Sequence, residues 1–395
     1  MKYFNLFLFL SLQMLTQVFA QEIMPRFRKQ VVDDKITIGY GMAIGDVDGD
    51  KKPDIILADK KQIAWYRNGD WNKTVIAENL TESDNVCVAA ADLDGDGKVE
   101  IAVGAQWNPG ETSDDVKSGA VFYLKRPAEP NVLWQPVKLH HEPTVHRMKW
   151  IKAVDGKFYL VVAPLHGRGN KAGEGRGVKI FAYQFNGGGS GNWPLTVLDS
   201  TLHLTHNFVP ERDQSGTTKA IYIASKEGVK YLNPLNPGSN TGSVSKGANL
   251  TDYGSGEISL GNIKMASPFI STIEPMHGTS VVIYEKINDR FIRTILDTTL
   301  NEGHGIAAAD FLNLGNDQVV AGWRLPNSNG KTGLKIYVRT STKSDWKPYW
   351  IDEGGIALED VQAADLNGDG KIDIIASGRS TRNVVIYWNE GTNKK

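Results

Sequence analysis

Short apolar runs alternate with turns rich in Gly, Asp and Asn along almost the whole chain of 395 residues. The runs at 86–91, 101–103 and 121–123 are typical, because each is brief and each is followed by a polar turn or loop. Runs of this length, rich in Val, Ile, Ala and aromatic residues, predict β-strands. The periodicity of an amphipathic helix is nearly absent. The pattern therefore predicts an all-β protein.

The same order of elements recurs about seven times. Each unit has an outer strand with an aromatic start, a small-residue strand, a turn, an apolar strand, a loop and a strand that ends in aromatic residues. The units span 42–66, 71–123, 134–181, 193–231, 257–284, 291–337 and 346–388. Seven four-stranded units predict a single domain over 21–395, a seven-bladed β-propeller whose radial repetition leaves only short protected edges.

The ends of the chain complete this arrangement. Residues 27–32 read as an outer strand with no inner strands before it, and the chain ends on a third strand with no outer strand after it. We therefore expect the N-terminal strand to complete the last blade and close the ring.

Three of the turns carry acidic residues at alternate positions. They hold Asp46, Asp48, Asp50 and Asp54; Asp92, Asp94, Asp96 and Glu100; and Asp365, Asn367, Asp369 and Asp373. In each turn the last acid lies eight residues after the first. Calcium takes about six to eight oxygen ligands, so such a loop can wrap one ion, and Gly95 and Gly97 permit the positive φ angles that it needs. We expect calcium-binding β-hairpins; the alternative is a set of tight Asp-Gly turns without metal.

The first twenty residues read as an export signal. Lys2 precedes a mostly apolar stretch at 4–15, and residues 18–20 provide a cleavage site. The stretch is too short to span a bilayer comfortably and no second one follows, so we expect no transmembrane segment and a secreted or periplasmic mature chain. The single cysteine, Cys87, is expected to be a small buried residue. A net charge of −1 without a basic tract argues against nucleic acid as a partner.

The Asp-x-Asp-Gly-Asp turns within this repeat resemble the FG-GAP, or VCBS, repeat family. That resemblance covers nearly the whole mature chain and implies a calcium-binding seven-bladed propeller, with the acids present in three units. The segments 165–169 and 273–278 resemble the propeller of aldos-2-ulose dehydratase and its bacterial relatives. This second resemblance implies dehydration of an oxidised or anhydro sugar. Exported seven-bladed polysaccharide lyases, which eliminate across a uronic acid using His and Tyr, are a related comparison.

The repeat also predicts where the histidines lie. The first strand of each unit is innermost, so its start and the end of the second strand share one rim, and the calcium turns occupy the other. His146, His206 and His304 begin innermost strands, and His166 and His277 end second strands. Five of the eight histidines are thus expected at one channel mouth. The alternative is that these rings only hydrogen-bond around a wet channel.

Clustered imidazoles at a channel mouth point to a metal or acid–base site. We expect a carbohydrate-active carbon–oxygen lyase, because elimination needs a base and a group that neutralises the developing anion. The expected catalytic residues are His146, His166, Tyr40 and Arg168; the expected zinc ligands are His206, His277 and His304; and the expected substrate-binding residues are Glu257, Trp107, Trp323 and Arg379. Two alternatives stay open: a carbohydrate- or protein-binding propeller without chemistry, and a hydrolase that uses Glu257 and Glu359. The sugar and the oligomeric state stay open as well.

Overall fold

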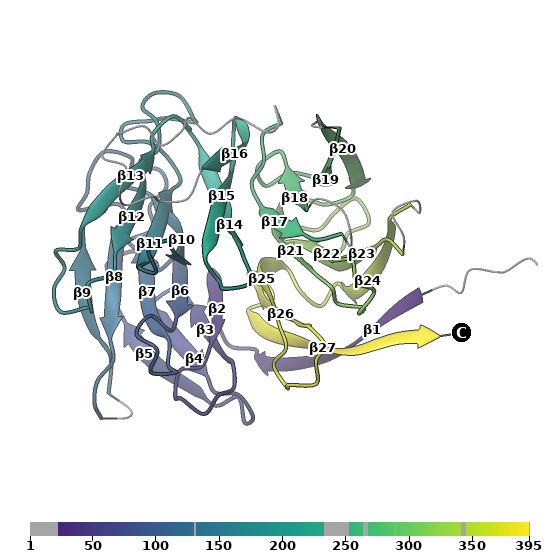
Figure 1. The fold of residues 1–395 in the computed structure, drawn as a ribbon, viewed down its shortest axis with the longest axis horizontal. Helices are drawn as coiled ribbons and strands as arrows, with labels where there is room; N and C mark the ends of the chain where they lie inside the picture. The colour runs from purple at the N-terminus through teal and green to yellow at the C-terminus, as the bar shows by residue number, and fades with distance from the viewer. Residues whose placement is uncertain are drawn as a thin grey trace, which may run out of the picture.

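The computed structural model describes residues 23–129, 132–232, 253–263, 268–288, 290–340 and 345–394. The predicted export signal at 1–20 lies outside these residues. Within them the chain forms 27 β-strands and no helix, which confirms the prediction of an all-β fold. The described segments hold no helix of the length and hydropathy needed to cross a membrane. The strands form seven antiparallel sheets around a common centre (Figure 1).

Each sheet is one blade, and its strands follow one another outward from the centre. The first three blades are β2 (Gly41–Gly45), β3 (Asp54–Ala58), β4 (Gln62–Tyr66) and β5 (Lys73–Glu78); β6 (Cys87–Ala91), β7 (Glu100–Ala105), β8 (Ala120–Lys125) and β9 (Gln135–Leu139); and β10 (Val145–Lys152), β11 (Phe158–Pro164), β12 (Ile180–Gln184) and β13 (Leu195–Asp199). The fourth and fifth are β14 (Thr205–Arg212), β15 (Thr218–Ser225) and β16 (Gly228–Leu232); and β17 (Ile258–Gly261), β18 (Phe269–Glu274), β19 (Ser280–Ile287) and β20 (Arg290–Asp297). The last two are β21 (Gly303–Ala309), β22 (Gln318–Trp323), β23 (Gly333–Val338) and β24 (Lys347–Glu353); and β25 (Leu358–Ala364), β26 (Asp373–Gly378), β27 (Asn383–Lys394) and β1 (Ile23–Asp33).

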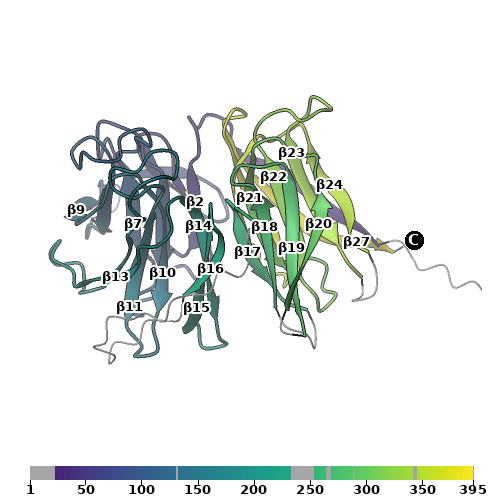
Figure 2. The same cartoon turned by 90° about the horizontal axis from the view of Figure 1, so that it is seen from above.

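The innermost strands meet around a central channel. Each contacts the innermost strand of the next blade, in the order β2, β6, β10, β14, β17, β21, β25 and back to β2. At the outside of the last blade β1 pairs antiparallel with β27, with Phe27 opposite Asn389. The two ends of the chain therefore share one blade, which both views show (Figures 1 and 2).

The middle strands of the blades supply most of the core. β3 and β26 are buried along their whole length, because each blade packs between two others and buries both of its faces. This accounts for their nearly continuous runs of Ile, Leu and Ala. The outer strand β20, in contrast, alternates between half-buried and exposed positions. One core cluster joins Ile55 and Leu57 of the first blade to Ile375 and Ile386 of the last, so the ring is closed by apolar packing as well.

A recurring hydrogen bond joins neighbouring blades near their outer strands. In three places a buried tyrosine of one blade donates its hydroxyl hydrogen to an aspartate on the outer strand of the preceding blade. The pairs are Tyr66 and Asp33, Tyr337 and Asp297, and Tyr387 and Asp352, at oxygen–oxygen distances of 2.7, 2.9 and 2.6 Å. A buried hydroxyl needs such a partner, so each pair also fixes the angle between two blades.

Candidate active site at the channel mouth

Four histidines meet where the innermost strands begin. His146, His206 and His304 are the second residues of β10, β14 and β21, and His277 lies in the turn after β18. Ring centroids are 4.5 Å apart for His146 and His206, 4.4 Å for His206 and His277, and 4.7 Å for His277 and His304. We name these four residues the histidine cluster. Equivalent positions of converging strands approach one another at the axis, which is why residues far apart in sequence form it.

Two of these rings are held by a hydrogen bond on Nδ1. Nδ1 of His146 lies 2.9 Å from the His206 carbonyl oxygen, and Nδ1 of His304 lies 2.6 Å from the Glu359 carbonyl oxygen. Nδ1 of His206 lies 2.9 Å from Oε1 of Glu257, in a charge contact without hydrogen-bond geometry. Because a carbonyl oxygen only accepts, we assign the ring hydrogen of His146 and His304 to Nδ1, and the adjacent carboxylate favours the same tautomer of His206. The Nε2 atoms of these three histidines therefore carry lone pairs.

In His277 the ring hydrogen lies on the other nitrogen, Nε2. A guanidinium hydrogen on Arg324 Nη2 is donated to His277 Nδ1, at 3.2 Å. Arginine only donates, so the ring hydrogen of neutral His277 lies on Nε2, which is 2.5 Å from Nε2 of His206. The result is a directed chain of hydrogen-bond donors, from Arg324 to His277 and from His277 to His206.

The surroundings keep the whole cluster neutral. Burial, aided by nearby cations such as Arg147 and Arg324, holds the pKa values of His146, His206 and His304 well below the usual 6.5. Burial and then Arg324 lower the pKa of the half-buried His277 to about 4. Uncharged imidazoles at neutral pH can act as bases, hydrogen donors or metal ligands.

Two buried glutamates balance the positive charge at this end of the channel. Glu359 accepts from Arg379 at 2.8 Å and from Arg324 at 3.3 Å. Glu257 accepts from the Asn207 amide at 2.6 Å and lies 3.7 Å from Arg147. Burial opposes the charge of Glu257, but Arg147, the neighbouring histidines and Asn207 together hold its pKa below the usual value. Glu257 is therefore an ionised carboxylate beside His206.

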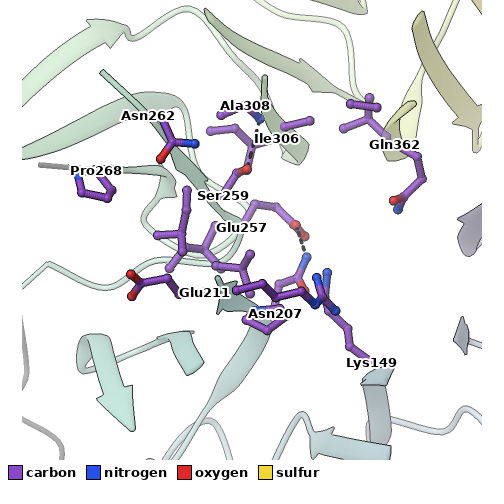
Figure 3. A pocket seen from close by; sticks show the side chains of 18 of the residues that line it. Lys149, Asn207, Glu211, Glu257, Ser259, Asn262, Pro268, Ile306, Ala308 and Gln362 are labelled. Atoms are coloured by element: carbon purple, nitrogen blue, oxygen red, sulfur yellow. Dashed lines mark hydrogen bonds between the residues drawn. The ribbon is translucent and has the colours of Figure 1, made fainter. Parts of the chain in front are cut away.

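Behind the histidine cluster the channel widens into a polar chamber of about 470 Å³. Its wall includes Lys149, Asn207, Glu257, Ser259 and Gln362, contributed by different blades and arranged around the same cavity (Figure 3). Glu257 lines the chamber and also lies against His206, so one carboxylate connects the two parts of the channel. The sequence pattern gave no prediction for Lys149 or Asn207, although both lie on innermost strands.

Two of the predicted aromatic residues lie beside the cluster. The Trp107 ring is 4.9 Å from that of His146, and Trp107 is half-buried. Tyr40 donates its hydroxyl hydrogen to Asp84 at 3.0 Å, and the Arg379 guanidinium lies 5.4 Å from the Tyr40 ring centroid. Burial and Asp84 raise the pKa of Tyr40, so this hydroxyl is held as a phenol and is a poor base.

His166 and Arg168 lie apart from the histidine cluster, in a separate cavity of about 260 Å³ that also includes Glu142. Arg168 donates to Glu142 at 2.7 Å, to Asp115 at 2.5 Å and to the Ser113 carbonyl at 2.9 Å. Its guanidinium is therefore already occupied by two acids. Among the described residues, Arg324 is the arginine that donates a hydrogen bond to a ring nitrogen of the cluster.

Trp323, predicted to bind substrate, does not face the channel mouth, whereas its neighbour Arg324 does. Trp323 ends β22 and is fully buried, with its ring 5.4 Å from Trp350 and its indole hydrogen donated to the Lys331 carbonyl. It is a core residue. Successive side chains of a strand point to opposite faces, so the next residue, Arg324, faces the channel instead. The sequence could have indicated Arg324, because it is a cation placed directly after the second strand of its unit.

Candidate calcium turns and comparison with known proteins

The three acidic turns share one hydrogen-bond pattern at the opposite rim. Both oxygens of the first acid accept from backbone amides: Asp46 from Gly49 and Lys51, Asp92 from Gly95 and Gly97, and Asp365 from Gly368 and Gly370. Gly95 and Gly97 have φ angles of 82° and 85°, which confirms the positive φ predicted for them. The turns are thus three copies of one backbone structure.

The acids of these turns fit calcium by their chemistry. Carboxylate oxygens of Asp46, Asp48 and Asp50 all lie within 4.8 Å of one another, and so do those of Asp92, Asp94 and Asp96. The acid at the ninth position instead accepts the amide hydrogen of the second residue of its turn. This applies to Asp54, Glu100 and Asp373, at 2.9, 2.8 and 3.1 Å. Burial raises the pKa of Asp54 to about 6 and that of Glu100 to about 7. A bound cation would favour their ionised forms.

The turn of the sixth blade lacks the alternate acids but keeps part of this pattern. Asp310 accepts from the amides of Leu314 and Gly315, its fourth and fifth following residues, where the first acid of the other turns accepts from its third and fifth. Gln318, at the ninth position, accepts from the Leu312 amide at 2.8 Å, as Asp54 does for Val47. A neutral amide oxygen thus supplies this structural bond without a carboxylate.

Three histidines also fit a transition metal. Nitrogen atoms of His206, His277 and His304 lie within 4.8 Å of one another. A ligating imidazole usually donates its other N–H to a carbonyl or carboxylate, as His304 does. Arg324 already donates to Glu302 at 2.7 Å and to Glu359 at 3.3 Å. If it paired with these two acids alone, the ring hydrogen of His277 could move to Nδ1, and its Nε2 would then carry a lone pair for the metal. The donor set is therefore compatible with zinc.

The comparisons with known proteins agree with this architecture. Residues 46–103 match the FG-GAP-like repeat family and residues 88–124 the FG-GAP repeat family. Residues 118–287 match the β-propeller domain of aldos-2-ulose dehydratase. This stretch includes His146, His206 and His277 of the cluster. No curated protein matches the chain.

Solved structures match over nearly the full length of the chain. One, described as BBS1N in complex with ARL6DN, soaked with lead, has a TM-score of 0.57 at 10% identity and covers 95% of this chain and 100% of that chain. A chain of the mitotic checkpoint complex has a TM-score of 0.54 at 9% identity and covers 98% of this chain and 99% of that chain. Identities this low show a likeness of fold alone. The chain is therefore a seven-bladed β-propeller with FG-GAP repeats, and its middle blades are similar to the propeller domain of aldos-2-ulose dehydratase.

Proposed function

We propose that the protein is an exported, calcium-binding, carbohydrate-active carbon–oxygen lyase whose site is the histidine cluster. The observation that carries this proposal is the convergence of four neutral imidazoles with Arg324 at one end of the channel. Its substrate would be a uronic sugar or a keto or anhydro sugar. The similarity of residues 118–287 to the propeller domain of a sugar dehydratase supports this substrate class.

His146 is the proposed base. Its Nδ1 hydrogen is held by the His206 carbonyl, so its Nε2 lone pair faces away from that bond, and its ring lies beside Trp107. The proton next to the sugar carbonyl or carboxylate would pass to this Nε2 as a carbon–carbon double bond forms and the neighbouring carbon–oxygen bond breaks. The low pKa of His146 keeps the ring unprotonated before the reaction.

Arg324 and His277 are proposed to stabilise the anion that develops. Arg324 carries a fixed positive charge and is only slightly exposed, so little water screens it. Neutral His277 would position Arg324 through its Nδ1, and the leaving oxygen would depart with the proton that His146 has taken from the sugar. Zinc held by His206, His277 and His304 would, when bound, add a Lewis acid for the carbonyl or carboxylate oxygen.

The test is to incubate the protein with uronic polysaccharides and with keto or anhydro sugars and to follow the unsaturated product by its ultraviolet absorbance. The wild-type chain should give product, and His146→Ala should lower kcat by about 10²- to 10⁴-fold. The matched control is His140→Ala, which alters a histidine outside the cluster. If the folded, metal-replete wild-type protein gives no product from any of these sugars, the proposed lyase activity is refuted.

A binding propeller without chemistry is the second candidate. It is favoured by the burial of the cluster, since His206 is only 1% exposed and His304 only 3%. It predicts that the cluster variants bind sugars as well as wild type and that no product forms. A hydrolase is less well supported, because the lowered pKa of Glu257 makes that residue a poor general acid.

A further inference from the structure

A cavity of about 400 Å³ lies at the rim that carries the acidic turns, between the first two blades. Its wall includes Asp48 of the first turn, Lys98 of the second turn, and Arg67, Arg126 and Trp134 nearby. The volume is within the range of small-molecule sites. We name it the interblade pocket. It lies at the opposite rim from the histidine cluster.

Arg67 is paired with the carboxylates that would bind calcium in the first turn. Its Nε lies 2.8 Å from Oδ2 of Asp48, and its Nη2 lies 3.7 Å from Oδ2 of Asp50. A divalent cation among these carboxylates would repel the guanidinium and compete for the same oxygens. Because Arg67 is 48% exposed and already lines the interblade pocket, it can turn into that pocket when released.

Within the described part of the chain, the other two cations of the pocket, Arg126 and Lys98, are not neutralised by a directly bound carboxylate. Arg126 donates to the Val47 and Val99 carbonyls, so it joins the backbones of both turns without using an acid. The acids nearest to it include Asp46, Asp96 and Glu100, which all belong to the calcium turns. Lys98 packs across Gly49 of the first turn. Calcium in the turns would therefore remove the negative charge of the turns that now offsets Arg67, Lys98 and Arg126. It would leave the exposed Glu129 as the acid of the wall that lies outside the turns.

We propose that the interblade pocket is a calcium-dependent binding site for a sugar acid. With calcium bound, Asp48 is occupied and Arg67 is released, so three cations face a pocket that also presents the half-buried ring of Trp65 and the hydroxyl of Thr74. A carboxylate is held by guanidinium groups in a forked geometry, and an aromatic face packs against the apolar side of a sugar ring. Calcium thus controls the pocket through Asp48, which belongs to both sites, and through its ion-pair partner Arg67.

Calorimetric titration of the full chain with sodium glucuronate, in calcium chloride and in chelator, tests this proposal. Wild type should bind glucuronate in calcium and at least about tenfold more weakly in chelator. Arg67→Gln should have two opposite effects, because it removes a competitor for the turn and a ligand from the pocket. Calcium binding should tighten about three- to fivefold, and glucuronate binding in calcium should weaken about tenfold.

The matched control is Lys371→Gln, since Lys371 pairs with Asp369 of the third turn at 2.9 Å, on another blade. This variant should leave glucuronate binding unchanged. His140→Ala, a change outside both the interblade pocket and the histidine cluster, should also leave it unchanged. Equal glucuronate binding in calcium and in chelator, or full binding by Arg67→Gln, would overturn the proposal. Glucose or inorganic sulfate binding as tightly as glucuronate would overturn the sugar-acid assignment.

Discussion

The imidazoles of His206 and His277 face each other with their Nε2 atoms 2.5 Å apart. Arg324 holds the other nitrogen of His277, and Glu257 lies against the other nitrogen of His206. The two rings therefore have fixed and opposite orientations along one chain of hydrogen bonds. This polarity, set by residues on three blades, determines which nitrogens of the cluster can accept a proton.

Glu257→Gln should disturb the orientation of His206 without removing any histidine of the cluster. The amide cannot replace a carboxylate as partner for both His206 and Arg147, so the orientation of His206 is lost. By analogy with the partners of ligating histidines, we expect a loss of about 10- to 100-fold in kcat with little change in KM. Steady-state kinetics test this, together with nitrogen NMR of the imidazoles, which reports the tautomer directly. Glu211→Gln, a change in the same chamber, is the control and should leave both readouts unaltered.

Arg324→Gln should raise the pKa of His277 above its value of about 4, because burial and then Arg324 hold it down. Loss of this donor should also lower kcat by about 10²- to 10³-fold, since the developing anion loses a fixed charge. Proton NMR titration of metal-free protein gives the pKa. Arg379→Gln removes a cation that contacts Glu359 but makes no hydrogen bond to His277. A His277 pKa that moves equally in both variants would contradict the specific role of Arg324.

Asp297, which accepts from Tyr337 of the next blade, should make the fold sensitive to acid. Burial opposes the charge of Asp297, but Lys335 and Thr299 hold its pKa below the usual 3.8. As pH falls the unfolded chain takes up its proton first, so this stabilisation is complete above about pH 3.8 and is lost as pH falls through the folded pKa. Asp297→Asn should lower the free energy of unfolding at neutral pH by about 1–3 kcal/mol and flatten this acid dependence. Urea unfolding at two pH values checks it, with the exposed Asp34→Asn as control.

Removal of calcium should lower the melting temperature of the protein. At a calcium concentration about 100-fold above Kd, one bound ion stabilises a fold by about 2.7 kcal/mol, so chelation should cost several degrees. Asp94→Asn should reduce this calcium-dependent shift, because Asp94 lies within the acid cluster of the second turn. Asp310→Asn, in the sixth turn, should leave the shift unchanged. Scanning calorimetry with and without chelator measures both, and an identical melting temperature in the two conditions would contradict calcium binding by the turns.

The repeat, the class of fold and the rim on which each residue lies could be predicted from the sequence. Strand starts and turn positions are local properties, and radial repetition turns them into places on a ring, so the meeting of His146, His206, His277 and His304 followed from their equivalent positions. The same reasoning placed the acidic turns on one rim.

Only the tertiary structure decided which side chains reach one another across the ring. Arg168 is held by Glu142 and Asp115, and Trp323 is buried by the packing of its own blade, whereas Arg324, one residue later, faces the channel. Position in a repeat fixes the rim, but orientation depends on the pleat of the strand and on partners from distant blades. Those contacts are long-range, and a local pattern of hydrophobic and polar residues does not encode them.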